Sequence, residues 1–361
     1  MAYRYRVIGK FLVCVDQSIL NAIRTFLLRH DRHQLDSLGI SRQFSRKLIK
    51  VVARAAISPK NSHLYESKPV FGHIAMRVHR GYKFFDFDRA LVTKLFSEDL
   101  SNTEAIAEIS ASKTASEFTA APRFVAADPD SAWFTEEYIR GTHATDLVSG
   151  RSSDYLNYYP DAERCLVQLA SSSRPIVVSA EEHISRLAEP LFRERWLRAR
   201  IDRDQVDEVS SFIETLRKWL MGNLRAAELC LVPTHGDFSL VNAISTRDGL
   251  RFIDWEGIGP GTFYSDLYNF MLTERFYGRT SDKFLAEAST LLTRFGDAIV
   301  EQIPDLREAA EMDHAVVRRL YYLERTRLMV DREVTPNLID VVIKSIKIFN
   351  NFDEESGELL M

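Results

Sequence analysis

The spacing of apolar and polar residues changes along the chain and divides it into segments with different predicted structures. Apolar residues recur at helical spacing over 18–38 and again over 42–56, with basic residues between them, which predicts two amphipathic helices. Short apolar runs separated by polar turns predict an antiparallel meander over 65–96. A helix and two further strands are predicted after the meander, over 102–113, 123–126 and 132–139.

Helical periodicity dominates the second half of the chain. Helices are predicted over 153–171, 180–200, 204–227 and, with breaks at Pro304 and Pro336, over about 265–350. A loop region with two short strands interrupts them after Pro233. This order predicts an α+β fold in which a small antiparallel-sheet lobe precedes a larger, mainly helical lobe. The predicted divisions are a basic helical N-terminal extension over 1–60, an N-lobe over 61–140, a C-lobe over 141–350 and a C-terminal tail over 351–361.

Length and composition agree with this division. A chain of 361 residues exceeds the roughly 250–300 residues that a single hydrophobic core supports. The three cysteines are far apart and form no C-x-x-C pair, which argues against a disulfide framework and against a cysteine zinc site. No apolar run approaches the roughly 18 residues that a membrane span requires. We therefore expect a protein of the cytoplasm.

Charge is distributed unevenly. Residues 1–60 hold 12 Lys or Arg and 3 Asp or Glu, a net +9, so the remaining 35 basic and 48 acidic residues carry −13. Two interpretations of the basic segment stay open: packing or homodimer formation through its apolar faces, and peripheral docking to an acidic partner or to the inner membrane face. No stripe of base-stacking aromatic residues accompanies the basic residues, so a nucleic-acid partner is not expected.

The segment with the most specific chemistry is H-G-D-x-x-x-x-N, starting at His235, followed by an I-D-W-E tetrapeptide whose Asp lies twelve residues after the Asn. Phosphoryl transfer needs hard oxygen ligands for Mg²⁺ and a group that orients and deprotonates the acceptor hydroxyl. Asn242 and Asp254 supply such oxygens, and Asp237 can accept the hydroxyl proton. The turn residues Asp248-Gly249 predict a hairpin that returns Asp254 to the side of Asn242.

With these motifs the chain resembles the aminoglycoside phosphotransferase and choline kinase-like superfamily, over roughly residues 64–345. The resemblance implies a protein kinase-like two-lobe fold, with a nucleotide-binding N-lobe and a catalytic, acceptor-binding C-lobe. It also implies that Asp237 is the catalytic base, that Asn242 and Asp254 are the metal ligands, and that His235 and Asp266 support the catalytic loop. The sequence departs from the family at Phe238-Ser-Leu-Val241, where many members have a His-Pro or similar pair, and in its basic first 60 residues.

The same resemblance identifies candidate nucleotide-binding residues. A kinase-like lobe needs a lysine on its third strand and a helix carboxylate to hold it, which implies Lys94 with Glu108, while Glu104 remains an alternative. The nucleotide base is expected at the connector, near Glu137 and Tyr138. No G-x-G-x-x-G precedes Lys94, so the residues that grip the triphosphate are not identified.

The function predicted from the resemblance is a small-molecule kinase. Mg²⁺ and ATP or GTP are the expected cofactor and donor, and the acceptor is a small molecule bearing a hydroxyl, of a sugar, aminoglycoside or amino-alcohol type. Glu256, next to the metal-ligand candidates, is either a further functional carboxylate or a structural one. One alternative is a non-catalytic kinase-fold protein that binds nucleotide or acts as a scaffold, with its basic arm docked to a partner or membrane surface. A second alternative is a metal-dependent hydrolase.

Overall fold

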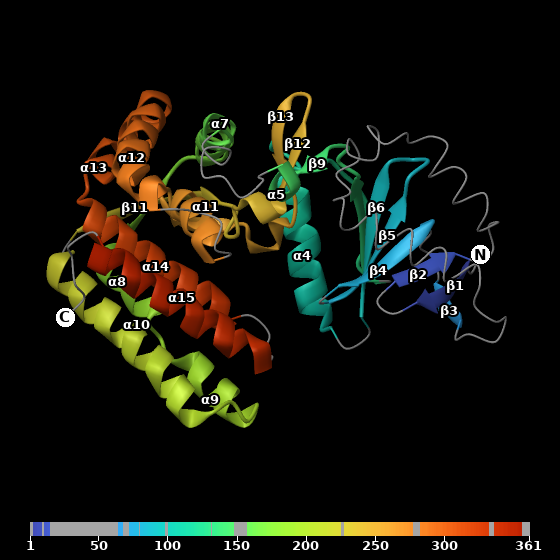
Figure 1. The fold of residues 1–361 in the computed structure, drawn as a ribbon, viewed down its shortest axis with the longest axis horizontal. Coiled ribbons are helices and arrows are strands. Elements are labelled where there is room, and N and C mark those ends of the chain that lie inside the picture. The colour runs from blue at the N-terminus through green and yellow to red at the C-terminus, as the bar shows by residue number, and fades with distance from the viewer. Residues whose placement is uncertain are drawn as a thin grey trace. The chain divides into compact units, whose positions relative to one another are not determined.

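The chain folds into two compact units, seen in a computed structural model (Figure 1). Unit 1 comprises Met1–Ser149 and Leu240–Glu256, and unit 2 comprises Gly150–Ser239 and Gly257–Met361. The sequence had suggested a boundary near residue 140 and had assigned 240–256 to the second lobe. The structure describes residues 3–8, 11–14, 64–67, 72–78, 80–97, 100–130, 132–147, 157–224, 227–276, 282–331 and 336–355.

Unit 1 is built on an eight-stranded antiparallel sheet with the strand order β3-β1-β2-β4-β5-β6-β8-β7. The predicted meander is confirmed, and β4, β5 and β6 pair in sequence order (Figure 1). The strands are β1 (Tyr3–Ile8), β2 (Phe11–Cys14), β3 (Leu64–Ser67), β4 (Ile74–Val78), β5 (Gly81–Asp86), β6 (Leu91–Phe96), β7 (Phe124–Asp128) and β8 (Trp133–Glu137).

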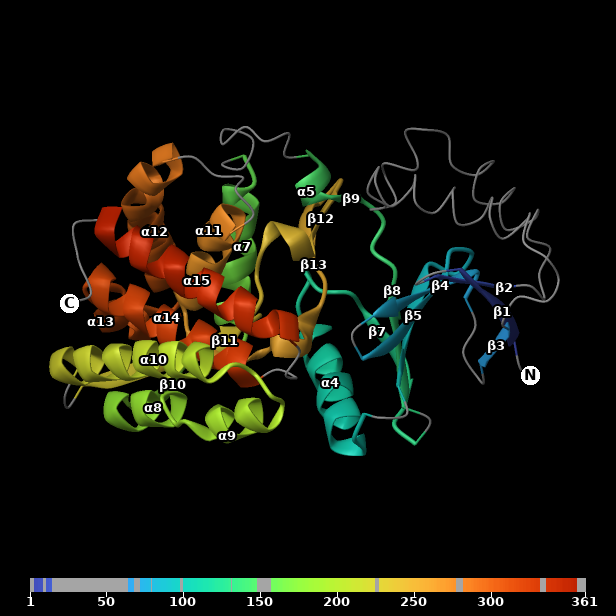
Figure 2. The ribbon, with the colours of Figure 1, turned by 60° about the horizontal axis from the view of Figure 1, so that its bottom comes forward.

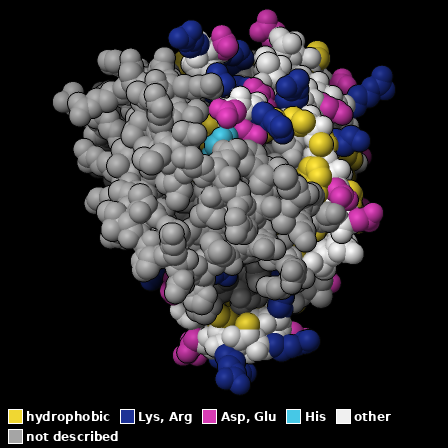
Figure 3. All heavy atoms as spheres, turned by 90° about the vertical axis from the view of Figure 1, so that its right-hand side faces the viewer, with side chains coloured by type: hydrophobic (Ala, Val, Ile, Leu, Met, Phe, Trp, Pro, Cys, Tyr) yellow, Lys and Arg dark blue, Asp and Glu magenta, His cyan; other side chains and the backbone are white. Residues whose placement is uncertain are grey.

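The N-terminal segment differs from its prediction where the structure describes it. Residues 3–14 were expected in a helical extension, but β1 and β2 form a hairpin that pairs with β3 and β4. Tyr3–Ile8 alternates apolar or aromatic residues with arginine, and this period of two is typical of a strand. The amphipathic helices predicted over 18–38 and 42–56 lie outside the described residues, and so does most of the basic charge. Described side chains on the face in Figure 3 mix basic and acidic groups.

Helix α4 (Asn102–Ala115) packs against the sheet and positions one carboxylate of the site. It begins at a capping box in which the Ser101 hydroxyl accepts from the Glu104 N–H and Glu104 accepts from the Ser101 N–H. Ala105 and Ile109 of its buried face join the sheet residues Phe96 and Phe134 in one hydrophobic cluster. The same face therefore carries Glu108 into the interior.

The predicted hairpin after Asn242 is confirmed and belongs to unit 1. Strands β12 (Ala243–Thr246) and β13 (Gly249–Phe252) pair from Ala243 with Phe252 to Thr246 with Gly249. On its other edge β12 pairs with β9 (Thr142–His143), which leads into the short helix α5 (Ala144–Leu147). The turn residues of the sequence thus define a local structure that carries both metal-ligand candidates.

Unit 2 is mainly helical, as predicted, but it also contains a three-stranded sheet that the sequence did not reveal (Figure 2). The predicted helix over 180–200 is divided at Pro190, which precedes α9. In the described residues α8, α10, α14 and α15 pack against one another, and none of the helices there has the length and hydropathy needed to span a membrane. The elements are α7 (Tyr159–Ala170), β10 (Ile176–Ser179), α8 (Ala180–Leu187), α9 (Leu191–Arg198), α10 (Arg203–Asn223), β11 (Glu228–Thr234), β14 (Gly259–Thr262), α11 (Ser265–Phe276), α12 (Asp282–Gln302), α13 (Arg307–Ala310), α14 (His314–Asp331) and α15 (Pro336–Glu355).

Candidate active site

The H-G-D segment forms a tight loop directly after β11 in unit 2. Gly236 adopts a left-handed φ of +77°, and a Cβ at this position would come within 2.5 Å of the Gly257 carbonyl oxygen, so glycine is required by conformation and by space. His235 is fully buried, and its Nδ1 accepts a hydrogen bond from the Asp237 N–H at 3.3 Å. Gly236 and His235 therefore shape the backbone that presents the Asp237 carboxylate.

Asp266 anchors this loop from the start of α11. Its two carboxylate oxygens accept from the His235 N–H at 2.5 Å and from the Gly236 N–H at 3.0 Å. The side chain is buried, and burial raises its pKa to about 7 although the two backbone donors act in the opposite direction. The sequence suggested this supporting position, and the structure brings Asp266 into direct contact with the loop.

A second anchor comes from Arg325 on α14. Its Nη2 donates to Asp237 Oδ1 at 2.9 Å and its Nη1 donates to the Gly236 carbonyl oxygen at 2.9 Å. Burial disfavours the charged guanidinium, but the charges of Asp237, Tyr321 and Asp266 and the hydrogen bond to Asp237 together outweigh this effect and raise the pKa of Arg325 above its ordinary value. The first contact orients the Asp237 carboxylate, and the second holds the backbone of the loop at Gly236. Sequence analysis did not find Arg325, because no motif surrounds it.

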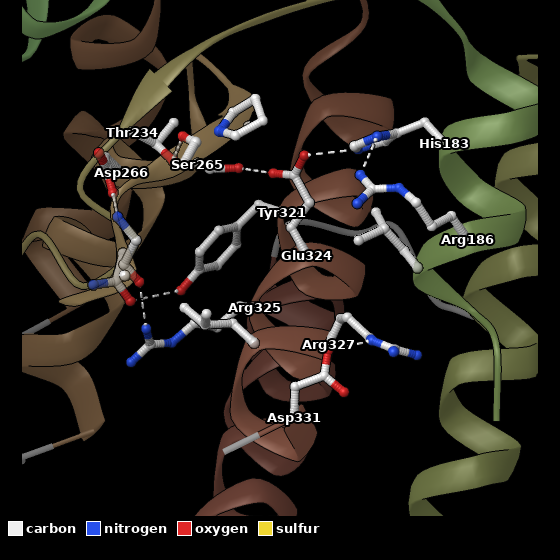
Figure 4. Close-up of a pocket in the computed structure, with 18 residues that line it drawn as sticks. His183, Arg186, Thr234, Ser265, Asp266, Tyr321, Glu324, Arg325, Arg327 and Asp331 are labelled. Atoms are coloured by element: carbon white, nitrogen blue, oxygen red, sulfur yellow. Dashed lines mark hydrogen bonds and ion pairs between the residues drawn. The ribbon is translucent and has the colours of Figure 1, made fainter. Parts of the chain in front are cut away.

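A cavity of about 190 Å³ lies in unit 2 beside this loop, bordered by α8, β14, α11 and α14 (Figure 4). Gly236 and Arg325 line it, so it adjoins the residues that hold Asp237. Its wall also contains Glu324, which accepts from His183 Nε2 at 3.1 Å and from the Thr262 hydroxyl at 2.9 Å. A connected set of hydrogen bonds around Glu324 therefore organises one side of the cavity.

Unit 1 holds Lys94 in a buried cluster of carboxylates. The Lys94 ammonium on β6 contacts Glu108 on α4, and it also lies 3.7 Å from Glu256 Oε2. Burial raises the pKa of Glu108 above its ordinary value, and the charge of Lys94 opposes this rise. Of the two helix carboxylates considered from the sequence, Glu108 is the one beside Lys94, whereas Glu104 caps the helix. Glu256 takes part in the same cluster.

The two metal-ligand candidates lie together at the base of the hairpin in unit 1. The Ile253 N–H donates to the Asn242 carbonyl oxygen at 2.9 Å, which joins the residue before Asp254 to Asn242. Asp254 has a left-handed φ of 68°, a conformation that non-glycine residues rarely adopt and that is enriched at functional sites. Lys83 Nζ lies 3.2 Å from Asp254 Oδ1, and the negative charge of Asp254 raises the pKa of Lys83.

The connector residues Glu137 and Tyr138 have partners within unit 1. Glu137 ends β8, and its carboxylate accepts from Arg251 of the hairpin at 3.1 Å. The Tyr138 N–H donates to the Ala90 carbonyl oxygen at 2.8 Å, and its ring meets Phe87 edge to face at 5.8 Å. A contact of this segment with a nucleotide base stays a prediction.

The structure thus gathers the candidate residues in three groups, one in unit 2 and two in unit 1. In unit 2, Asp237 lies with the two residues expected to support it, His235 and Asp266. In unit 1, one group contains Lys94 with Glu108, and another contains Asn242 with Asp254. Lys83 was missed, although its position on β5, directly opposite Lys94, follows from the predicted meander once the register is known.

A family model matches this chain, and solved structures share its fold. The sequence model of the phosphotransferase enzyme family matches residues 82–311. Among solved structures, a choline kinase from Cryptosporidium parvum Iowa II is similar with a TM-score of 0.50 and 13% identity, over 78% of this chain and 90% of that chain. A thermostable mutant of aminoglycoside phosphotransferase APH(4)-Ia gives a TM-score of 0.50 and 12% identity, over 78% and 94%. The choline kinase LicA from Streptococcus pneumoniae gives 0.49 and 16%, over 84% and 99%. No curated protein matches the chain.

Proposed function

The chain belongs to the phosphotransferase enzyme family, and from this we propose that it transfers the terminal phosphoryl group of ATP or GTP to a hydroxyl group of a small molecule. The observation that carries the proposal is the anchoring of Asp237. Asp266 holds the backbone of its loop and Arg325 holds its carboxylate. Phosphoryl transfer requires this kind of positioning, because the reaction depends on alignment of the reacting groups and on charge neutralisation.

Asp237 is the proposed catalytic base. Its carboxylate accepts the proton of the acceptor hydroxyl as the oxygen attacks the terminal phosphorus. Arg325 holds Oδ1, so the carboxylate is oriented before the acceptor arrives. His235 and Asp266 keep the loop in the conformation that presents it.

Asn242 and Asp254 are the proposed Mg²⁺ ligands, and their chemistry fits this ion. Both offer hard oxygen atoms, and Asp254 Oδ1 already holds a cationic group in the form of the Lys83 ammonium. Among the described residues no three His, Cys, Asp or Glu side chains gather as a metal site. Two protein ligands are sufficient for Mg²⁺, which commonly takes its other ligands from water and substrate phosphates. When bound, the ion neutralises charge on the phosphate oxygens.

Lys94 is the proposed phosphate-binding residue of β6, and Glu108 fixes its ammonium group. We expect the nucleotide base at the connector, near Glu137 and Tyr138. The similar structures are a choline kinase and an aminoglycoside phosphotransferase, so amino alcohols and aminoglycosides are candidate acceptors.

Calorimetry tests the proposal. We expect ATP or GTP to bind the natural chain in the presence of Mg²⁺, and Asp254→Ala to weaken that binding. Asp248→Ala is a matched control, since it removes the same charge from the exposed turn of the same hairpin. If folded protein binds neither nucleotide, the proposed function is wrong. If binding is found, a screen of sugars, aminoglycosides and amino alcohols with the preferred donor identifies the acceptor.

A further inference from the structure

The two glycines of the β4–β5 region, Gly72 and Gly81, lie nine residues apart and do not form a glycine-rich loop. A Cβ on Gly72 would come within 2.8 Å of the Phe85 N, and a Cβ on Gly81, with φ of +141°, would come within 2.0 Å of the Leu95 carbonyl oxygen. Both glycines are therefore required for packing inside the sheet. Val78 of β4 pairs with Gly81 of β5, so two residues connect the strands. A connection this short cannot wrap a polyphosphate in the manner of a glycine-rich loop.

The same region carries a second lysine that faces the candidate phosphate site. Lys83 lies directly opposite Lys94 in the register of β5 and β6, and directly paired residues project from the same face of a sheet. The side chain of Lys83 is 20% exposed, and its Nζ lies 3.2 Å from Asp254 Oδ1. It therefore lies between the phosphate-binding lysine and a metal-ligand candidate, both in unit 1.

The stability of the sheet alone does not favour two lysines, Lys83 and Lys94, at directly paired positions. Like charges directly opposite each other on neighbouring strands are destabilising. The two ammonium groups also differ in how firmly they are held. Lys94 is buried between Glu108 and Glu256, whereas Lys83 is paired with Asp254, whose side chain is 41% exposed. Lys83 is thus the cation that can exchange its carboxylate partner for a phosphate oxygen at low cost.

We propose that Lys83 is a second phosphate-binding residue, which replaces the missing glycine-rich loop by gripping the polyphosphate of the nucleotide. This inference rests on the proposed function. In the free protein Lys83 pairs with Asp254, and on nucleotide binding its ammonium group transfers to a phosphate oxygen. Lys94 and Lys83 then neutralise the polyphosphate from two neighbouring strands.

Nucleotide binding to Lys83→Met tests this role independently of turnover. ATP, ADP and AMP are titrated calorimetrically, both with Mg²⁺ and in EDTA. A lost hydrogen bond between charged groups corresponds to about tenfold to hundredfold weaker binding. We expect a loss of this size for ATP, little change for AMP, and persistence of the loss in EDTA. Lys83→Arg, which keeps the charge, should recover part of the affinity. Lys113→Met, at an exposed position of α4, is the matched control and should bind ATP like the natural chain.

Chemical labelling of the natural chain gives a second measurement that needs no variant. An amine-reactive reagent, followed by mass spectrometry, should modify Lys83 less in ATP than in AMP. The inference is overturned if Lys83→Met binds ATP within about twofold of the natural chain, or if ATP leaves the labelling of Lys83 unchanged. Failure of the natural chain to bind any nucleotide would instead refute the proposed function itself.

Discussion

Removing the ionisable group at Asp266 should change how the stability of the protein depends on pH. The pKa of this carboxyl rises from an ordinary 3.8 to about 7 in the folded chain, mainly because of burial. Between these values the folded state keeps the proton while the unfolded state releases it. The free energy of unfolding of the natural protein therefore decreases as the pH rises from about 4 to about 7, and it levels off above that range.

The size of the effect follows from the two pKa values. A difference of about three pH units corresponds to about 4 kcal/mol, since each pH unit contributes 1.36 kcal/mol. Asp266→Asn cannot titrate, so this contribution disappears from the variant. Asparagine also disturbs the bonds to the His235 and Gly236 N–H groups, but that loss is the same at every pH.

The measurement is urea unfolding of the natural chain and of Asp266→Asn at several pH values from 4.5 to 8. We expect the stability of the natural chain relative to the variant to fall steadily up to about pH 7. Asp297→Asn removes the same charge from an exposed position of α12 and serves as the control. A stability difference between the natural chain and Asp266→Asn that stays constant across this range would refute the reasoning.

Four further changes have expected outcomes. Asp237→Asn should lower kcat by about 10²–10⁴-fold, the usual contribution of a general base, with nucleotide affinity unchanged by calorimetry. Arg325→Lys keeps the charge but loses the bidentate contact, so kcat should fall by about tenfold or more in steady-state assays, with the KM for nucleotide little changed. Lys94→Met leaves the Glu108 carboxylate buried without its cation and should lower the free energy of unfolding by roughly 3–5 kcal/mol in urea titrations, a loss that added Glu108→Gln should partly reverse. Gly81→Ala should lower the melting temperature, because its Cβ would come within 2.0 Å of a backbone oxygen of β6.

Local features of the site could be predicted from the sequence. The hairpin between Asn242 and Asp254 follows from the Asp248-Gly249 turn, because turn chemistry acts over a few residues. The resemblance to the kinase-like superfamily implied Glu108 as the partner of Lys94, and the two side chains are in contact. These contacts depend on short stretches of chain whose periodicity is clear.

Long-range contacts could not be predicted in this way. Arg325 meets Asp237 across 88 residues, and its surroundings on α14 carry no motif that distinguishes it from other arginines. Three of the four residues of strand β14, Gly-Pro-Gly-Thr, are of types that are depleted in strands, and the segment pairs with β11 through tertiary contact. Tertiary context decided both outcomes, and a single sequence does not reveal that context.

The insertion of residues 240–256 into unit 1 affects how the protein is made. Strand β9 at Thr142–His143 finds its partner only in β12, after the whole segment 150–239 of unit 2 has left the ribosome. At roughly 5–20 residues per second, a nascent chain carries β9 without that partner for about 5–20 seconds. The sheet of unit 2 is likewise completed only when β14, which follows Gly257, has been synthesised and pairs with β11. Each unit therefore begins to fold before the other can finish, and cutting the chain at any single peptide bond would not release two complete units.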